Sequence, residues 1–145
     1  GKGISAIVGN DAAGAEDLAM AEALLSAVGQ VVRLDAEDQI DAVTGVSGSG
    51  PAYVFYMIDA LAEAGEAEGL PRDLAMELAK ATVAGAGALA QSADETPEQL
   101  RINVTSPNGT TQAGLEVLMD RERGLSPLIR RTVAAAANRS RELRR

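Results

Sequence analysis

The chain has 145 residues, a mass of 14.9 kDa and a formal net charge of −8, which is the size of one ordinary domain. Hydrophobic residues make up 46% of the chain but aromatic residues only 2%, so its core has to be built from Ala, Leu, Val and Ile, and such small side chains favour closely packed helices. The chain holds no His and no Cys, which excludes imidazole and thiol catalysis, disulfides and the usual zinc sites, and we expect no metal.

Residues 1–36 are predicted to form a strand, a helix and a second strand. The β-branched, apolar run at 3–9 is typical of a buried strand, 15–28 carries apolar residues at helical spacing, and 30–34 alternates as a strand does. A unit of this size cannot cover both faces of a sheet by itself. We therefore expect the edge of a larger α/β domain, and the start at Gly1 rather than Met also favours a fragment.

Residues 37–145 are predicted to be helical throughout. Glycines and prolines divide them into helices at 37–46, from Pro51 to about 68, from Pro71 to about 89, at 97–104, up to about 120 and from Pro127 to the end. Thr96 opens the helix at 97 with a capping-box pattern, in which the Gln99 side chain returns to the backbone. Gly65, Gly85 and Gly87 weaken their helices by about 1 kcal/mol each, so we expect close contact with another helix there.

Charge is divided unevenly along the chain. Residues 1–100 hold 17 acidic and 4 basic residues, a net charge of −13, whereas residues 101–145 hold 4 acidic and 9 basic residues, a net charge of +5. A basic end can contact nucleic acid or a membrane, but arginines at a helix end also complement its dipole and can pack beside acidic helices of a second chain. We favour the second interpretation and expect no nucleic-acid partner, because stacking aromatics are scarce. No apolar run is long enough to span a membrane, and the lack of Cys fits a reducing, cytoplasmic compartment.

The glycine-bounded turn at 9–14 lies between a predicted strand and a predicted helix, where phosphate-binding loops occur. It has neither the G-x-G-x-x-G spacing of a dinucleotide site nor the Lys-Ser/Thr pair of a P-loop. Asp11, Glu16 and Asp17 would also repel a phosphate. We therefore predict a plain turn.

The segment 45–51 combines three glycines and two serines with Pro51. It can break the chain between two helices as a tight link, with Ser47 or Ser49 as the N-cap. It can equally present a backbone surface that a flat ligand approaches closely, because glycines leave no side chains in the way. The residues alone leave both interpretations open.

Residues 104–111 are the strongest candidate for a binding site. They contain three threonines, one serine and no acid, and a helix is expected to begin within them. A helix N-terminus offers unpaired N–H groups and about half a positive charge, which suits a carboxylate. A simple Asn-Gly turn followed by a Thr cap is the alternative, although it does not explain so many hydroxyl groups.

Residues 97–118 resemble the signature of the pyrroline-5-carboxylate reductase family. The matching positions are Pro97, Leu100, Val104, Thr105, Ser106, Pro107, Asn108, Gly109, Thr110, Thr111, Gly114, Leu115 and Leu118. The stretches 41–53, 70–72 and 139–143 are similar to that family as well, so the resemblance covers essentially the whole chain. Two positions depart from it: Asn108, where the family often has a second Gly, and Met119, where it often has an acid. Asn tolerates the left-handed backbone that such a Gly would adopt.

The resemblance implies a mainly α fold. Residues 37–145 would form an interleaved helical dimerisation and substrate-binding domain, similar to the C-terminal domain of 6-phosphogluconate dehydrogenase. Residues 1–36 would be the β-α-β remnant of a Rossmann-type dinucleotide-binding domain. The implied reaction is NAD(P)H-dependent reduction of 1-pyrroline-5-carboxylate to L-proline, the last step of proline biosynthesis, by a homodimer or a higher oligomer. Nothing in the chain corresponds to the rest of the cofactor domain, so the isolated chain is expected to be nearly inactive.

The resemblance also assigns roles to matching residues. Backbone N–H groups near Gly109, Thr110 and Thr111, with the Ser106 hydroxyl, would hold the substrate carboxylate, and the catalytic Thr111 hydroxyl would face the ring nitrogen. The residues placed near the nicotinamide of NADPH or NADH are Asn103, Ser49, Gly50, Pro51 and Ala52. Hydride transfer is the cofactor's chemistry, so a chain without His, Cys or metal can still serve it by orienting the imine.

Two other functions stay open at this point. The chain could be a non-catalytic helical dimerisation module, or the helical domain of another two-domain dehydrogenase. The absence of a catalytic Lys or His at helical spacing disfavours the usual versions of the second. Long Ala- and Gly-rich helices in so small a chain predict more apolar surface than it can cover alone, and hence a homodimer.

Overall fold

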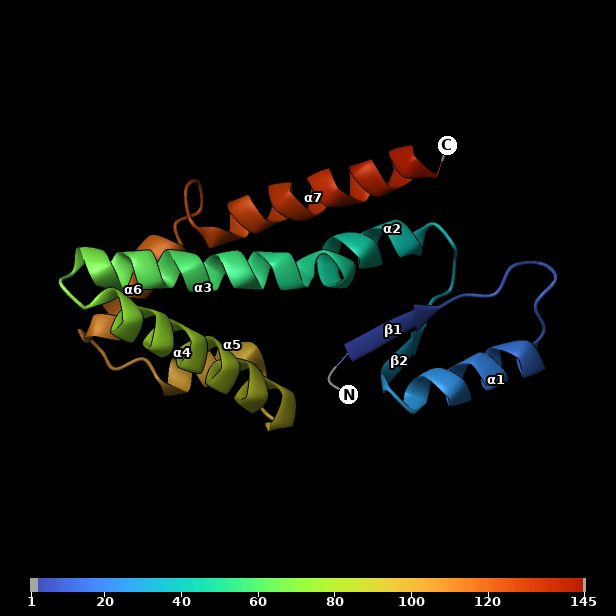
Figure 1. The fold of residues 1–145 in the computed structure, drawn as a ribbon, viewed down its shortest axis with the longest axis horizontal. Helices are drawn as coiled ribbons and strands as arrows, with labels where there is room; N and C mark the ends of the chain where they lie inside the picture. The colour runs from blue at the N-terminus through green and yellow to red at the C-terminus, as the bar shows by residue number, and fades with distance from the viewer. Residues whose placement is uncertain (1–2, 145) are drawn as a thin grey trace. The chain divides into compact units, whose positions relative to one another are not determined.

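The computed structural model describes residues 3–144. It contains two strands and a series of helices (Figure 1), and it divides into two compact units. One unit combines Gly1–Gly50 with Arg130–Arg145, and the other is Pro51–Ile129.

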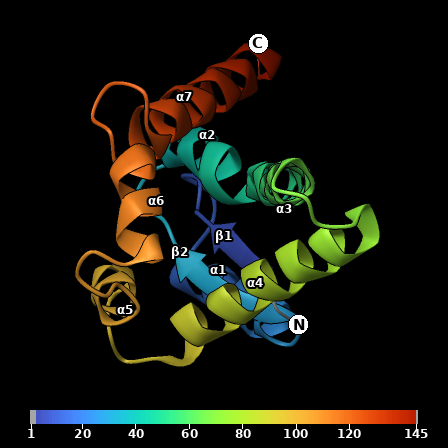
Figure 2. The same cartoon turned by 90° about the vertical axis from the view of Figure 1, so that its left-hand side faces the viewer.

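The first unit begins with a β-α-β motif, as predicted. The strands β1 (Gly3–Ile7) and β2 (Gly29–Arg33) pair in parallel, with Gly3 opposite Gly29, and α1 (Ala15–Ser26) connects them. The strands lie side by side with α1 next to them (Figure 1, Figure 2). A Cβ at Gly29 would lie 2.4 Å from the carbonyl oxygen of Gly3, so this close approach requires glycine.

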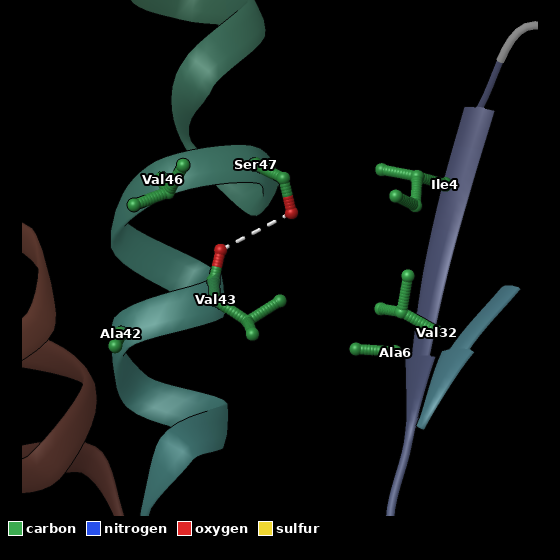
Figure 3. A pocket seen from close by; sticks show the side chains of 7 residues that line it. All are labelled: Ile4, Ala6, Val32, Ala42, Val43, Val46 and Ser47. Carbon is green, nitrogen blue, oxygen red and sulfur yellow. Dashed lines mark hydrogen bonds between the residues drawn. The ribbon is translucent and has the colours of Figure 1, made fainter. Parts of the chain in front are cut away.

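Helix α2 (Gln39–Val43) continues into a π-helical turn, η1 (Thr44–Gly48), and α3 begins at Gly50. The backbone N–H of Ser49 donates to the carbonyl of Thr44 at 2.8 Å, and the Ser47 hydroxyl donates to the carbonyl of Val43 at 3.2 Å (Figure 3). The predicted helix boundary therefore falls at Ser49, between η1 and α3, but Ser47 is not an N-cap, because its hydroxyl bonds backwards to Val43. A π turn contains one residue more than an α-helical turn, and the backbone keeps helical dihedral angles through this segment.

An apolar hollow of about 340 Å³ separates η1 and α2 from the sheet. Ile4, Ala6 and Val32 point from the strands towards Val43 and Ser47 (Figure 3). Its lining is almost entirely hydrocarbon, so it offers packing surface and no polar chemistry.

The C-terminal helix α7 (Leu125–Leu143) packs against η1 through its second half. Gly45 is buried, and a Cβ there would lie 2.9 Å from the carbonyl oxygen of Val133 and 3.4 Å from the amide nitrogen of Ala137. Ala137 is itself buried. Glycine at position 45 therefore lets the two backbones touch.

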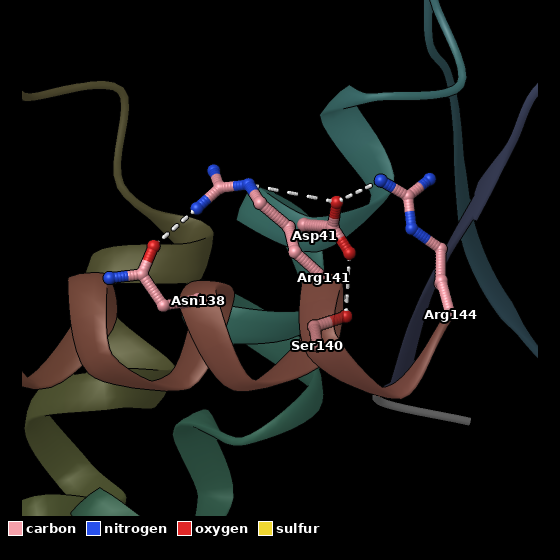
Figure 4. A network of polar contacts seen from close by, with 5 residues as sticks. All are labelled: Asp41, Asn138, Ser140, Arg141 and Arg144. Carbon is pink, nitrogen blue, oxygen red and sulfur yellow. Dashed lines mark hydrogen bonds and ion pairs between the residues drawn. The ribbon is translucent and has the colours of Figure 1, made fainter.

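Asp41 on α2 is completely buried, and its carboxylate accepts hydrogen bonds from side chains at the C-terminal end of the chain (Figure 4). The Ser140 hydroxyl donates to its Oδ1 at 2.7 Å, and the Arg144 guanidinium donates to its Oδ2 at 2.5 Å. Arg141 lies 3.8 Å from the same Oδ2. Part of the basic C-terminal sequence therefore pairs within the chain, which fits the structural interpretation of its charge.

The second unit contains α3 (Gly50–Ala67) from Pro51 onwards, together with α4 (Arg72–Ser92), α5 (Pro97–Asn103) and α6 (Thr110–Leu118). Its buried core is small and consists of alanines, namely Ala62, Ala75 and Ala79, with Ile58 and Met76 packed against them. A Cβ at Gly65 would lie 3.2 Å from the Cβ of Ala75, which confirms the predicted close helix contact there. Gly85 and Gly87 meet no atom of the described chain within 4 Å, so their predicted contact is not made within the chain.

Many large apolar side chains of the second unit stay exposed in the single chain. Leu61, Leu78 and Leu89, for example, are 45%, 48% and 51% exposed. The chain thus presents more apolar surface than it covers, as expected for a domain that associates. Of the helices described here, none is long and apolar enough to cross a membrane.

A tight turn joins α6 to α7. The Asp120 carboxylate accepts hydrogen bonds from the backbone N–H groups of Glu122 and Arg123 at 2.9 and 2.7 Å. A Cβ at Gly124 would lie 2.4 Å from the carbonyl oxygen of Leu118, so glycine is needed where the chain turns back. The bonds from Arg123 and Glu122 lower the pKa of Asp120 because they stabilise its charged form.

Candidate functional site

The loop between α5 and α6 is a compact turn that carries one residue in the left-handed region. Asn108 has φ = 59°, a conformation that Asn adopts more readily than most residues. The backbone N–H of Gly109 donates to the carbonyl of Ser106 at 3.0 Å, which closes the turn. A Cβ at Gly109 would lie 3.1 Å from that same carbonyl oxygen. The pair Asn108-Gly109 therefore fits this turn for steric reasons.

Helix α6 begins directly after the turn with its first amides uncapped. Gly109 is the N-cap residue and makes no side-chain cap hydrogen bond, and the first turn holds no acid. The backbone N–H groups of Thr110, Thr111 and Gln112 have no partner inside the helix, because the first intrahelical bond runs from Ala113 to the carbonyl of Gly109. These donors and the helix dipole make the N-terminus of α6 attractive to an anion.

Helix α1 provides a contrast within the same chain. Its first turn carries Glu16 and Asp17, and the Asp17 carboxylate accepts from the N–H of Gly14 at 2.8 Å. The Asn10 side chain accepts from the N–H groups of Ala12 and Ala13, each at 3.1 Å. The chain thus occupies the amides of Ala12, Ala13 and Gly14 itself and places two carboxylates in the first turn of α1, where they would repel a phosphate, in agreement with the prediction of a plain turn.

The hydroxyl groups around the α6 N-terminus are not equivalent. The Thr105 hydroxyl donates to the carbonyl of Arg101 at 2.6 Å, so it anchors the loop to α5 and is not available to a ligand as a donor. Within residues 3–144, no hydrogen bond engages the side chains of Ser106, Thr110 or Thr111, which are exposed. The structure thus brings together Ser106, Gly109, Thr110 and Thr111, the four residues predicted to contact the substrate.

Asn103 is the last residue of α5, directly before the loop. Thr96 accepts from the N–H of Gln99 at 3.2 Å, which confirms the first half of the predicted capping box. The second half is wrong, because the Gln99 side chain donates to the Asn103 Oδ1 at 2.8 Å instead of returning to the backbone. The contact between Gln99 and Asn103 spans one helical turn, and it fixes the orientation of a side chain predicted to lie near the cofactor.

The other predicted cofactor residues lie where η1 passes into α3. Ser49 and Gly50 are half-buried, whereas Pro51 and Ala52 are exposed. A Cβ at Gly50 would meet no described atom within 4 Å. The backbone at Gly50 is therefore open to close approach, as the flat-ligand interpretation requires. Ser49 and Gly50 belong to the first compact unit, and Asn103 belongs to the second.

A hollow of about 410 Å³ lies beside the loop, between α5 and α6. Its lining residues are Arg101, Thr105, Gln112, Leu115, Glu116 and Met119. The Arg101 guanidinium contacts the Met119 sulfur at 2.7 Å, at the position where the family often has an acid. Across the described part of the chain, no group of three or more acidic residues is arranged to hold a metal ion.

Comparison with known proteins identifies the class to which this fold and loop belong. The family model described as "Pyrroline-5-carboxylate reductase dimerisation" matches residues 37–143. The chain therefore belongs to the pyrroline-5-carboxylate reductase family.

Individual relatives agree with this assignment. The chain is 49% identical over 143 residues to a pyrroline-5-carboxylate reductase from Synechocystis sp., covering 99% of this chain and 52% of the relative. A solved reductase structure from Coxiella burnetii matches with a TM-score of 0.88 and 38% identity, covering 96% of this chain and 51% of that one. A solved structure of a Plasmodium falciparum pyrroline carboxylate reductase with NADP bound matches with a TM-score of 0.77 and 28% identity. The match covers 93% of this chain and 51% of that one. The chain spans about half the length of the curated relatives that it matches.

Proposed function

We propose that this chain is part of a pyrroline-5-carboxylate reductase, in which the N-terminus of α6 binds the substrate carboxylate. The reaction reduces 1-pyrroline-5-carboxylate to L-proline with NADPH or NADH. A hydride adds to the imine carbon, the C=N double bond becomes a single bond, and the ring nitrogen takes up a proton from solvent. The observation that carries the proposal is the set of uncapped amides at Thr110 and Thr111, which have no acid in the same helical turn.

The loop residues have two roles in this proposal: they bind the substrate carboxylate and they orient the ring nitrogen. The amides near Gly109, Thr110 and Thr111, together with the Ser106 hydroxyl, hold the carboxylate. The Thr111 hydroxyl faces the ring nitrogen and donates a hydrogen bond there, which polarises the C=N bond towards accepting a hydride. This arrangement needs no strong general base in the chain.

The cofactor contacts of this chain are confined to the nicotinamide end. The nicotinamide supplies the hydride when the cofactor is bound, and Asn103 with Ser49, Gly50, Pro51 and Ala52 would lie against it. The open backbone at Gly50 fits such a flat ring. Neither described strand is followed by a G-x-G-x-x-G turn, so the cofactor's phosphates have to be held outside this chain. We therefore expect the 145-residue chain alone to be nearly inactive.

The assembly we propose is a homodimer formed through the helical domain, with a higher oligomer as an extension, in the cytoplasm. Residues 1–36 belong in this proposal to the dinucleotide-binding domain, and residues 37–145 belong to the dimerisation domain. The exposed leucines and the open Gly85 and Gly87 on α4 support a helix contact with a second copy. Glycines at such a contact let two backbones approach closely.

The activity is tested by joining the chain to the part of the Synechocystis relative that it does not cover, which in this proposal supplies the dinucleotide-binding domain. We expect pyrroline-5-carboxylate-dependent oxidation of NADPH, and we expect Thr111→Val to lower kcat by about 10²-fold, the scale of losing a positioned proton-transfer or polarising group. Ser26→Ala, which removes an exposed hydroxyl at the end of α1, is the control and should keep full activity. A folded, dimeric fusion without turnover would instead favour a non-catalytic dimerisation module.

A further inference from the structure

Gln112, which the family signature leaves unspecified, is bonded at both ends of its side-chain amide. Its Oε1 accepts a hydrogen bond from the backbone N–H of Asn108 at 2.8 Å. Its Nε2 donates to the Glu116 carboxylate one helical turn further on, at 3.1 Å. Gln112 is half-buried and lines the hollow between α5 and α6. It therefore connects the left-handed residue of the loop to the body of α6.

The two bonds of Gln112 fix which way its amide faces. The backbone N–H of Asn108 can only donate, so it needs the oxygen of the glutamine, and the Glu116 carboxylate can only accept, so it needs the nitrogen. The opposite flip would place a donor against a donor and an acceptor against an acceptor. Glu116 thus holds Gln112 in the orientation that Asn108 requires.

Asn108 is the residue at which this support matters most. Its φ of 59° is less favourable than right-handed backbone for a residue with a side chain. A backbone that changed conformation there would redirect the amides that follow it, namely those of Gly109, Thr110 and Thr111. The turn bond from Gly109 to Ser106 holds one side of this residue, and the bond to Gln112 holds its own N–H group.

We propose that Gln112 is a positioning residue for the carboxylate site: its side chain holds Asn108 in the left-handed conformation and so aims the Thr110 and Thr111 amides at a common anion. This inference rests on the proposed function. Gln112 acts through the loop, and its side chain does not itself touch the substrate. Glu116 serves the same purpose indirectly by orienting the Gln112 amide.

The test uses the full chain and three sets of variants. Gln112→Ala removes the bond to Asn108. The exchange of Gln112→Glu with Glu116→Gln keeps an acceptor for Asn108 and a donor at position 116, but it moves a negative charge one turn closer to the anion site. Gln91→Ala on α4 is the control, because Gln91 is an exposed helical glutamine outside the loop.

Two readouts separate positioning from general stability. The first is the hydrogen-exchange rate of the Asn108 amide. The second is the preference for L-proline over L-prolinamide, which lacks the carboxylate, measured from chemical-shift changes of the Thr110 and Thr111 amides. We expect Gln112→Ala to speed Asn108 exchange and to reduce the preference for proline, each by about fivefold, the scale of one hydrogen bond. The double variant Gln112→Glu/Glu116→Gln should keep the slow hydrogen exchange of the Asn108 amide. It should weaken the binding of proline but not that of prolinamide. Gln91→Ala should change neither readout.

Unchanged Asn108 exchange and unchanged proline preference in Gln112→Ala would overturn the positioning role. If Asn108 exchange rises in that variant but the unaltered chain does not prefer proline to prolinamide, Gln112 supports the loop and the proposed carboxylate site is wrong. Equal effects of Gln112→Ala and Gln91→Ala on both readouts would also overturn the inference. If Gln112→Ala does not fold, the double variant Gln112→Glu/Glu116→Gln still decides the test, because it keeps the bond to Asn108 and changes only the charge near the anion site.

Discussion

Asp41 in the first compact unit and the N-terminus of α6 in the second are both polar sites on helices. They differ in whether the chain itself supplies their hydrogen-bond partners. The Asp41 carboxylate is fully buried and bonded by Ser140 and Arg144 of the same chain. The first amides of α6 have no side-chain cap. Groups that the chain satisfies internally stabilise the fold, whereas donors left open near the surface are available to a ligand. The contrast separates the residues expected to affect stability from those expected to affect binding.

The largest effect on stability is expected from removing the strongest partner of Asp41. Arg144→Met leaves a buried carboxylate with Ser140 and the more distant Arg141, so we expect unfolding to become easier by about 2–3 kcal/mol, somewhat below the range for a fully buried pair because Arg144 is half exposed. Urea unfolding followed by circular dichroism measures this. Arg131→Met, at an exposed position on the same helix, is the control, and an equal loss in the two variants would contradict the role of Asp41.

The next effect concerns the contact between η1 and α7. Gly45→Ala places a methyl group 2.9 Å from the Val133 carbonyl oxygen, so we expect a loss of about 1–2 kcal/mol from overpacking. Gly48→Ala, in the same turn, meets only the Thr44 side chain at 3.7 Å and should gain up to about 1 kcal/mol from helix propensity. Thermal unfolding of the two variants compares them directly. A stabilising Gly45→Ala would mean that α7 does not pack as described.

An effect of similar size is expected in the second unit at Asn108. Asn108→Val puts a β-branched residue at φ = 59° and should cost about 1–2 kcal/mol, whereas Asn108→Gly should be neutral or slightly stabilising. Both changes leave the Asp41 cluster untouched. The proline titration of the loop amides should weaken with Val and persist with Gly. Equal binding by the two variants would show that the left-handed turn is not needed.

The smallest effect is a pH dependence at Asp120. Hydrogen bonds from Arg123 and Glu122 hold the pKa of Asp120 below its usual value in the folded chain. The stabilisation is therefore present above the unfolded pKa of about 3.8 and is lost as pH falls through the folded pKa. The stability difference between the unaltered chain and Asp120→Asn should shrink in acid. Asp59→Asn, an exposed change on α3, is the control, and a pH-independent difference for Asp120→Asn would contradict the assignment.

Glycines, prolines and apolar spacing are local signals, and they predicted the helices and the two strands to within a few residues. The π turn at Thr44–Gly48 was not predicted, because it depends on backbone hydrogen bonds that residue types do not specify. The role of Asp41 could not be predicted, since its partners Ser140 and Arg144 lie about 100 residues further along the chain.

The candidate site was more predictable than the buried cluster. Ser106, Gly109, Thr110 and Thr111 are contiguous or nearly so, and a helix N-terminus creates their chemistry locally. The interactions of Gln99 and Gln112 were missed, because a glutamine on a helix surface has the same pattern whether or not its amide is engaged. The i, i+4 spacing of Gln99 to Asn103 and of Gln112 to Glu116 was the one available signal.

The central claim, that the α6 N-terminus holds a carboxylate, is tested most directly by a crystal structure of the chain joined to a dinucleotide-binding domain and soaked with L-proline. We predict the proline carboxylate within hydrogen-bond distance of the Thr110 and Thr111 amides and the Ser106 hydroxyl, with the ring nitrogen towards the Thr111 hydroxyl. Ordered proline bound elsewhere, with those amides facing only water, would contradict the account.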